Sequence, residues 1–371
     1  MNPLGVGTPW PAEGLERVAG CPVCGKSSRT LLHEGLRDRI FFCAPGEWRL
    51  YRCTSCGSGY LDPRPTAETI GMAYSRYFTH RHEARAMSAF RRLRLALANG
   101  YCNARFGIKR RPYIRGGAWL AHLFPRRRAS IDAYARNLDR AQPGEVLLDV
   151  GCGDGLFLAF AAEMGWKVEG VEPDPQAAEA ARKQGLTIHQ GSIECLRDRG
   201  EVFDVITLSH VIEHVHDPHD LMAACFRLLK PGGRIWLETP NLEAAGHLRY
   251  GRDWRGLEPP RHLVLFTWAS LHSLLSKAGF LAATPLPAHP MASFTFPASD
   301  AIRRDKDPNA LASIPVRVRW QAWRADLRPA LTKREFITIV ARKPSASAGD
   351  AISRGLLRAA PTTQAVRAAS P

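Results

Sequence analysis

The feature that most constrains the fold of this chain is a glycine-rich loop between an apolar strand and an apolar helix. Residues 145–150 are expected to form a buried strand, and 156–164 a helix. Between them stand Gly151, Gly153 and Gly155. Glycines at such a turn let the backbone bend sharply and approach a ligand closely. The loop therefore predicts a binding site at the carboxyl end of a strand, where open α/β sheets bind their ligands.

Strand and helix patterns alternate through the rest of this region. The expected strands span 145–150, 166–171, 186–189, 203–208, 234–238, 280–283 and 335–341. The expected helices span 156–164, 175–184, 219–229 and 267–278. Such alternation is typical of βαβ units on a parallel sheet. We predict an α/β fold with a doubly wound, mostly parallel seven-stranded sheet.

Changes in composition divide the chain into four parts. Residues 1–65 are rich in Cys, Gly and Pro, with short β-like runs such as 40–42, and should form a small module of their own. Residues 66–140 are expected to be a basic helical cap or linker. The sheet domain should span 141–343, with a Pro-rich insertion at 285–333. Residues 344–371 have the composition of a disordered tail.

The charges around the glycine loop indicate which cofactor it binds. A dinucleotide motif, G-x-G-x-x-G, would need a glycine where Leu156 stands. A pyrophosphate would also lie poorly beside Asp149 and Asp154, whereas a sulfonium and an ammonium group suit carboxylates. Glu172, 23 residues after Asp149, ends the next strand and can accept both hydroxyls of a ribose. We therefore predict S-adenosylmethionine.

Four sequence runs carry a resemblance to a known family: VLLDVGCGDG, GVEPD, FDVITLSHVIEHVHDP and LLKPGGRIWLETPN. Together they resemble the class I S-adenosylmethionine-dependent methyltransferases, whose fold is Rossmann-like. More narrowly, they resemble the branch with the quinone-biosynthesis O-methyltransferases and enzymes of glycan and natural-product clusters. The resemblance covers about residues 141–285 and the last strand. It implies methyl transfer, on oxygen, to a sugar, a glycan end, or a quinone- or polyketide-like phenol.

The resemblance also implies the residues of the cofactor site. Asp149, Gly151, Cys152 and Gly153 would shape the methionine end, with Glu172 on the ribose. Ser192 and Ile193 would frame the adenine, although many members have Asp at the first of these positions, which leaves that contact to the backbone. Ser209 and His210 would face the methyl donor.

Histidines near this edge are candidates for the base that removes a hydroxyl proton. His214, just after the fourth strand, either acts as the base or orients its loop. His262, in the loop after the fifth strand, is a candidate base or acceptor-binding group. Arg261 could hold an anionic acceptor or lie solvated at the surface. Tyr74 is either an acceptor contact or a packing residue.

The cysteine pattern predicts a metal site in the first module. Cys21, Cys24, Cys53 and Cys56 form two C-x-x-C pairs with 28 residues between them. Four thiolates make a closed, tetrahedral zinc site, and such sites are structural. The alternatives are unligated thiols or a redox pair. A total of nine cysteines argues against a disulfide framework, and Cys195, like the others of the main domain, is expected to be buried.

The net charge of +16 is concentrated in one segment, since residues 81–140 hold 15 Lys and Arg against 3 Asp and Glu. This segment could rest on an anionic membrane surface, or its charges could simply be solvated. With no signal peptide or spanning segment evident, we expect a cytoplasmic protein, peripheral at the inner membrane face. An RNA methyltransferase is an alternative, but the tetrapeptide N/D-P-P-Y/F is absent after the fourth strand. A non-catalytic cofactor-binding protein is a further alternative.

Overall fold

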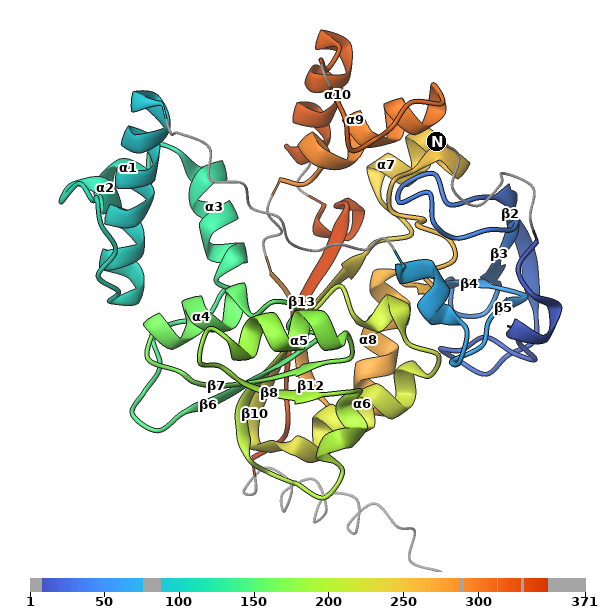
Figure 1. Ribbon diagram of the computed structural model, residues 1–371, viewed down its shortest axis with the longest axis horizontal. Coiled ribbons are helices and arrows are strands. Elements are labelled where there is room, and N and C mark those ends of the chain that lie inside the picture. The colour runs from blue at the N-terminus through green and yellow to red at the C-terminus, as the bar shows by residue number, and fades with distance from the viewer. Residues whose placement is uncertain (1–8, 76–87, 287–289, 312, 328–329, 346–371) are drawn as a thin grey trace, which may run out of the picture.

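The computed structural model describes residues 9–75, 88–286, 290–311, 313–327 and 330–345 (Figure 1). Its largest element is a seven-stranded sheet in the order β12-β13-β10-β9-β6-β7-β8. The strands are β6 (Val146–Val150), β7 (Lys167–Glu172), β8 (Thr187–Gln190), β9 (Phe203–Ser209), β10 (Leu229–Pro240), β12 (Leu281–Pro285) and β13 (Phe336–Arg342). Only β13 runs against its neighbours. The predicted α/β fold, with a mostly parallel seven-stranded sheet, is confirmed.

Each face of the sheet has its own core, because successive residues of a strand point to opposite faces. On β6, Leu147 belongs to the cluster that includes Phe160 of α4 (Leu156–Glu163) and Ala178 of α5 (Pro175–Arg182). Its neighbour Leu148 belongs to the other cluster, with Leu221 of α6 (Pro218–Leu228) and residues of α8 (Trp268–Lys277). Helices therefore cover both faces, as a doubly wound sheet requires.

Helix caps fix the loops that leave the carboxyl edge of this sheet. Asp174 accepts two backbone N–H groups at the start of α5, and Asp217 does the same at the start of α6. In both helices proline takes the next position, where its missing N–H costs nothing. The two loops after β7 and β9, which carry candidate site residues, thus end at defined points.

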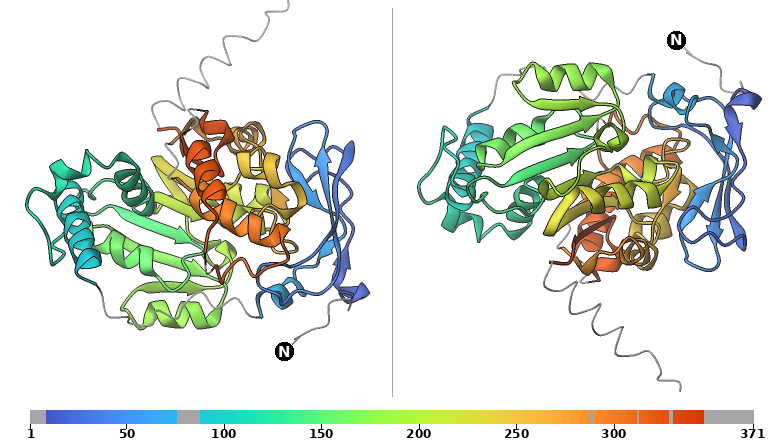
Figure 2. Two further views of the ribbon diagram at one scale, coloured as in Figure 1. Left: turned by 90° about the horizontal axis from the view of Figure 1, so that it is seen from above. Right: turned by 90° about the horizontal axis from the view of Figure 1, so that it is seen from below.

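The N-terminal module is a small sheet that the main domain completes. It holds β1 (Leu15–Glu16), β2 (Arg29–Leu36), β3 (Trp48–Cys53), β4 (Gly59–Leu61) and β5 (Arg64–Pro65). Its larger sheet has the order β11-β4-β3-β2, and β11 (Val264–Leu265) comes from the loop after β10. Figure 2 shows the module lying against this part of the main domain. The pairing of Val264 with Tyr60 and of Leu265 with Gly59 ties the two together.

The β-like run 40–42 is not a strand, which corrects the sequence-based expectation. The carboxylate of Asp38 accepts backbone N–H groups from four residues that follow it, at 3.0 to 3.2 Å. These residues are Ile40, Phe41, Cys43 and Ala44. The segment wraps around this buried carboxylate. Its amides therefore bond the side chain of Asp38 instead of a neighbouring strand.

The remaining helices fall into two groups. The basic segment forms α1 (Ala89–Phe106), α2 (Gly117–Ala121) and α3 (Pro125–Tyr134); the others are α7 (Ala245–Tyr250), α9 (Ala292–Arg303) and α10 (Val316–Asp326). The 3₁₀ turns are η1 (Ala12–Gly14), η2 (Ile70–Tyr74), η3 (Ile193–Leu196), η4 (Ile212–His214), η5 (Gly251–Asp253) and η6 (Leu331–Lys333). In the described part of the chain, none of the helices has the length and apolar character needed to cross a bilayer. The predicted tail lies almost wholly outside the described residues.

Candidate functional site

The glycine loop has the backbone conformation that its sequence suggested. Gly151, Gly153 and Gly155 all have positive φ, at 69°, 56° and 81°. A Cβ on Gly151 would stand 2.6 Å from a methyl carbon of Val211, so a larger residue would have to displace that side chain. The amides of Gly151 and Cys152 both bond the carbonyl of Val171. The loop is therefore held against the end of β7.

Glu172 ends β7 and faces this loop. One carboxylate oxygen accepts the N–H of Gly153 at 2.8 Å, and the other accepts the N–H of Asp174 at 2.9 Å. A carboxylate can accept about four hydrogen bonds, so about two remain for a diol. Burial raises the pKa of Glu172, and the two amides act against that shift. Glu172 thus lies beside the glycine loop with lone pairs to spare, and its role as the ribose acceptor stays a prediction.

Asp149 is fully buried and paired with an arginine that sequence reasoning missed. Arg136, from the turn after α3, contacts one carboxylate oxygen, and the Thr207 hydroxyl donates to that oxygen at 3.0 Å. The second oxygen, Oδ2, has no hydrogen-bond partner in the described part of the chain. Burial raises the pKa of Asp149, while Arg136 lowers it. An unpartnered oxygen beside the glycine loop fits the ammonium of S-adenosylmethionine.

Arg136 is held by aromatic rings as well as by Asp149. Its guanidinium carbon lies 3.7 Å from the ring centre of Phe157 and 5.5 Å from that of Trp236. Residues 81–140 contain fifteen basic residues, and most such side chains are solvated. Nothing in the sequence around Arg136 therefore predicts that this arginine is buried. Only the tertiary packing distinguishes it.

The predicted adenine residues stand at the end of β8. Ser192 caps η3, and its hydroxyl accepts the Glu194 N–H at 3.4 Å. Ile193 is buried, which suits an apolar wall. Cys195, expected to be buried, is exposed instead, whereas the buried residues of η3 are Ile193 and Leu196. That expectation was wrong.

Ser209 and His210 end β9, on the same edge. His210 has φ of +55°, and its ring lies 3.1 Å from Glu213 through Nδ1 and 3.7 Å from Glu238 through Nε2. Burial alone would disfavour the charged ring, but the two carboxylates outweigh it and raise the pKa of His210 to about 10. A protonated ring donates hydrogen bonds, so His210 suits the role of donor rather than base.

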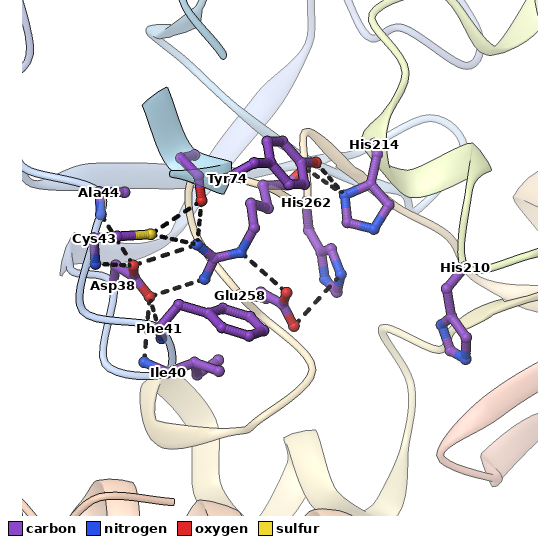
Figure 3. Close-up of polar contacts among 12 residues, drawn as sticks. Asp38, Ile40, Phe41, Cys43, Ala44, Tyr74, His210, His214, Glu258 and His262 are labelled. Atoms are coloured by element: carbon purple, nitrogen blue, oxygen red, sulfur yellow. Dashed lines mark hydrogen bonds and ion pairs between the residues drawn. The ribbon is translucent and has the colours of Figure 1, made fainter. Parts of the chain in front are cut away.

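The two candidate catalytic histidines lie side by side. The rings of His214 and His262 have their centres 4.8 Å apart, at 68° to each other. His214 Nδ1 lies 3.0 Å from the Arg261 carbonyl and 3.0 Å from the Tyr74 hydroxyl. His262 Nδ1 lies 2.8 Å from the Gly256 carbonyl. Figure 3 shows His214, His262 and His210 on one side of this region.

Arg261 does not hold an anionic acceptor, which corrects one of the two sequence-based readings, and it is not solvated either. Its side chain is fully buried. Nη2 donates to Asp38 at 2.8 Å, and Nε donates to Glu258 at 3.0 Å. Two carboxylates and the Ala73 carbonyl thus use its donors. The arginine joins the N-terminal module to the loop that carries His262.

The four predicted zinc ligands are gathered at one point. Sulfur atoms of Cys21 and Cys56 lie 3.5 Å apart, as do those of Cys24 and Cys53, and all four fall within 4.8 Å of one another. The Ser58 hydroxyl, which sequence reasoning missed, lies 3.2 Å from the Cys21 sulfur and 3.0 Å from that of Cys56. Four convergent sulfurs fit a tetrahedral zinc ion, and Ser58 supplies the outer hydrogen bonds such sites favour.

Comparison with known proteins agrees with the geometry of the cofactor edge. Residues 121–283 match the family described as Methyltransferase domain. The chain carries a class I S-adenosylmethionine-dependent methyltransferase domain. The methyltransferase domain contains the glycine loop, Glu172 and the η4 turn, but it leaves out the cysteine cluster.

The methyltransferase domain is similar to ubiquinone biosynthesis O-methyltransferases. It is 37% identical to that of Xanthomonas oryzae over 118 residues, which is 30% of this chain and 48% of the relative. It is 35% identical to that of Cereibacter sphaeroides over 160 residues, 39% of this chain and 65% of the relative. The chain thus spans about half to two thirds of the length of these relatives. A solved methyltransferase from Thermotoga maritima is 24% identical with a TM-score of 0.40, covering 62% of this chain and 97% of that one.

Proposed function

We propose that this protein transfers a methyl group from S-adenosylmethionine to an oxygen atom of a small-molecule or glycan acceptor. The observation that carries the proposal is the convergence of unused acceptors at one edge of the sheet. Glu172 keeps free lone pairs beside the glycine loop, and Asp149 Oδ2 has no partner in the described residues. These are the groups that a cationic nucleoside needs. Oxygen is favoured because the relatives are O-methyltransferases.

The roles of the residues follow from their positions. S-adenosylmethionine supplies a reactive methyl group on a sulfonium. Glu172 would hold the ribose and Asp149 the ammonium, so that the methyl faces the loop after β9. His214 and His262 each bond a backbone carbonyl through Nδ1, and a carbonyl only accepts. Each ring therefore keeps a lone pair on Nε2, which can receive the acceptor's proton. Nε2 of His262 lies 3.9 Å from a Glu258 carboxylate oxygen. Much of the rate would come from positioning.

The cofactor assignment is tested by calorimetry on Glu172→Gln. Loss of a charge-assisted hydrogen bond worth roughly 1.5–3 kcal/mol should weaken binding by about tenfold or more. The matched control is Glu179→Gln on α5, whose side chain is 55% exposed. Turnover is then followed with isotope-labelled methyl donor and candidate phenols or sugars. No binding by the wild type would overturn the proposal, and binding without turnover on any acceptor would favour the non-catalytic alternative.

The four-cysteine cluster is proposed to hold a structural zinc ion. Its position supports this role, since one cysteine pair precedes β2, the other begins at the end of β3 and precedes β4, and β4 pairs with β11. Zinc would therefore stabilise the loop that carries His262. With four protein ligands the ion has no open position, so it would take no part in the chemistry.

We also propose that the end of α1 rests on an anionic membrane surface. Residues 88–95 are all exposed, including Phe90 at 66% and Leu93 at 51%, with Arg91, Arg92 and Arg94 between them. Apolar side chains flanked by arginines suit insertion at the headgroup level. Phe90→Ser with Leu93→Ser should reduce flotation with phosphatidylglycerol vesicles, whereas Val316→Ser, 79% exposed elsewhere, should not. Equal flotation of all variants, or capture by RNA alone, would contradict this.

A further inference from the structure

A cavity of about 420 Å³ lies at the amino edge of the seven-stranded sheet. Its walls come from the segment before β6, the start of β9, the first part of β10 and the end of β13. Glu145 lines the cavity just before β6, whereas Gly151 of the cofactor loop follows that strand. The five residues of β6 span roughly 16 Å, so the cavity is separate from the site proposed for methyl transfer.

Two arginines stand directly opposite each other at this cavity. Arg234 of β10 and Arg342 of β13 are partners in the antiparallel ladder, and both line the cavity. Cβ atoms of such partners lie about 4.5–5.5 Å apart, and like charges in this position destabilise a sheet. Arg234 is half-buried, and burial, followed by the charge of Arg342, lowers its pKa. The sheet therefore holds a repulsive pair of guanidinium groups.

The carboxylates of the cavity do not neutralise this pair, because each has another partner. Asp204 accepts a hydrogen bond from the Lys230 ammonium group at 2.7 Å. Asp139 forms an ion pair of 2.6 Å with Arg105 of α1. Glu145 accepts a backbone N–H of its own loop at 2.7 Å. The acidic side chains are thus used within the protein.

Three arginines of the cavity keep their charge uncompensated. In the described part of the chain, the guanidinium groups of Arg140 and Arg234 have no hydrogen-bond or ion-pair partner. Nη1 of Arg342 donates to the Gly232 carbonyl at 3.3 Å, and its guanidinium likewise pairs with none of the described carboxylates. A guanidinium group presents a planar fork of N–H donors that matches the oxygens of phosphate and carboxylate. The cavity therefore has the donors and the charge to hold an anion.

We propose that this cavity binds a phosphate group, as free phosphate or on a small molecule, between Arg140, Arg234 and Arg342. A phosphate dianion brings two charges and at least three oxygens to three arginines, whereas a carboxylate brings one charge and two oxygens. The volume falls within the range of small-molecule pockets, roughly 300–1,000 Å³. It leaves room for an organic group beside Val205 and Pro231, which also line the cavity.

The effect of removing Arg234 distinguishes a ligand-binding role from a structural one. Arg234→Met keeps an unbranched side chain but removes one of the two opposed charges. Without phosphate, this variant should have a thermal midpoint at or above that of the wild type, because the repulsion is gone. Phosphate should raise the midpoint of the wild type, since a ligand that binds only the folded state stabilises it, and should raise that of the variant less.

The experiment is calorimetric titration of the zinc-loaded full-length protein with inorganic phosphate and, separately, with glucose 1-phosphate, at constant ionic strength. We expect one equivalent of ligand. Arg234→Met and Arg140→Gln should each weaken binding about tenfold or more, because each removes charge-assisted hydrogen bonds. The control is Arg197→Met, which removes the same charge from a side chain that is 76% exposed outside the cavity. Tighter binding of the sugar phosphate would identify an ester as the ligand, and equal binding would identify free phosphate.

Two outcomes would overturn the phosphate site. One is the absence of saturable binding of either ligand by the wild type. The other is a less stable Arg234→Met variant that still binds phosphate as the wild type does, since the arginine would then serve the sheet alone. S-adenosylmethionine binding, measured on the same samples, keeps this test apart from the proposed function. A protein that binds the methyl donor but neither phosphate ligand refutes only the phosphate site.

Discussion

Arg261 and Asp38 form a fully buried ion pair between two parts of the chain that are 223 residues apart in sequence. Nη2 of the arginine lies 2.8 Å from Oδ1 of the aspartate, and both side chains have no exposed area. The guanidinium also lies 4.1 Å from the ring centre of Phe41. The pair connects the N-terminal module with the loop that carries His262, so the module helps to hold that loop in place.

Removing this arginine should destabilise the protein strongly. Arg261→Met leaves Asp38 and Glu258 buried with less compensating charge, and breaking a buried pair typically costs about 3–5 kcal/mol. The free energy of unfolding, measured by urea denaturation, should fall by that amount. Arg319→Met, on the exposed side of α10, serves as the control. A loss of less than about 1 kcal/mol would mean that Arg261 does not act as a connection.

The effect of Arg261→Met on the free energy of unfolding should depend on pH. Burial by itself would raise the pKa of Asp38, but Arg261 and the backbone amides outweigh it and lower the pKa. A carboxyl group with a lowered folded pKa adds stability above its unfolded value of about 3.9 and loses it as the pH falls. The stability difference between wild type and Arg261→Met should therefore be smaller at pH 3.5 than at pH 7. A difference that stays constant across this range would contradict the assignment of Asp38 as the partner.

The sequence predicted the sheet well because its signals are local. The apolar runs and the glycine loop each lie within a few residues, and β6, β7 and β9 formed within one or two residues of the expected bounds. The four-cysteine cluster could also be predicted, because the C-x-x-C spacing brings the two sulfurs of each pair close together.

The contacts that build the acceptor side could not be predicted in this way. Strand β11 has only two residues, and it pairs with β4 about 200 residues earlier in the chain. Arg136 and Arg261 are buried, whereas composition alone favours solvated arginines. Such contacts are decided by tertiary packing between distant segments, which neither periodicity nor motif spacing records.

The cofactor site is expected to depend on the charge of Asp149. Asp149→Asn keeps the size of the side chain but removes the charge that would meet an ammonium group. S-adenosylmethionine binding should weaken by about tenfold or more, as loss of a charge-assisted hydrogen bond of roughly 1.5–3 kcal/mol implies. Calorimetry on Asp198→Asn, whose side chain is 93% exposed, provides the control. If Asp149→Asn binds S-adenosylmethionine with unchanged affinity, the carboxylate pairs with Arg136 and does not bind the ammonium group.

Loss of a cysteine ligand is expected to act on the distant loop. Cys53→Ser should release about one equivalent of zinc, because a hydroxyl is a poor substitute for a thiolate in a closed four-sulfur site. Without zinc, the turns that carry the knuckles lose their anchor, and the pairing of β4 with β11 should weaken. Metal analysis measures the first effect, and amide hydrogen exchange at 59–61 and 263–265 measures the second. Cys195→Ser, at an exposed thiol outside the cluster, should change neither quantity. A wild-type protein without zinc would refute the metal assignment, whereas faster exchange confined to the knuckles would show that the module does not support the loop.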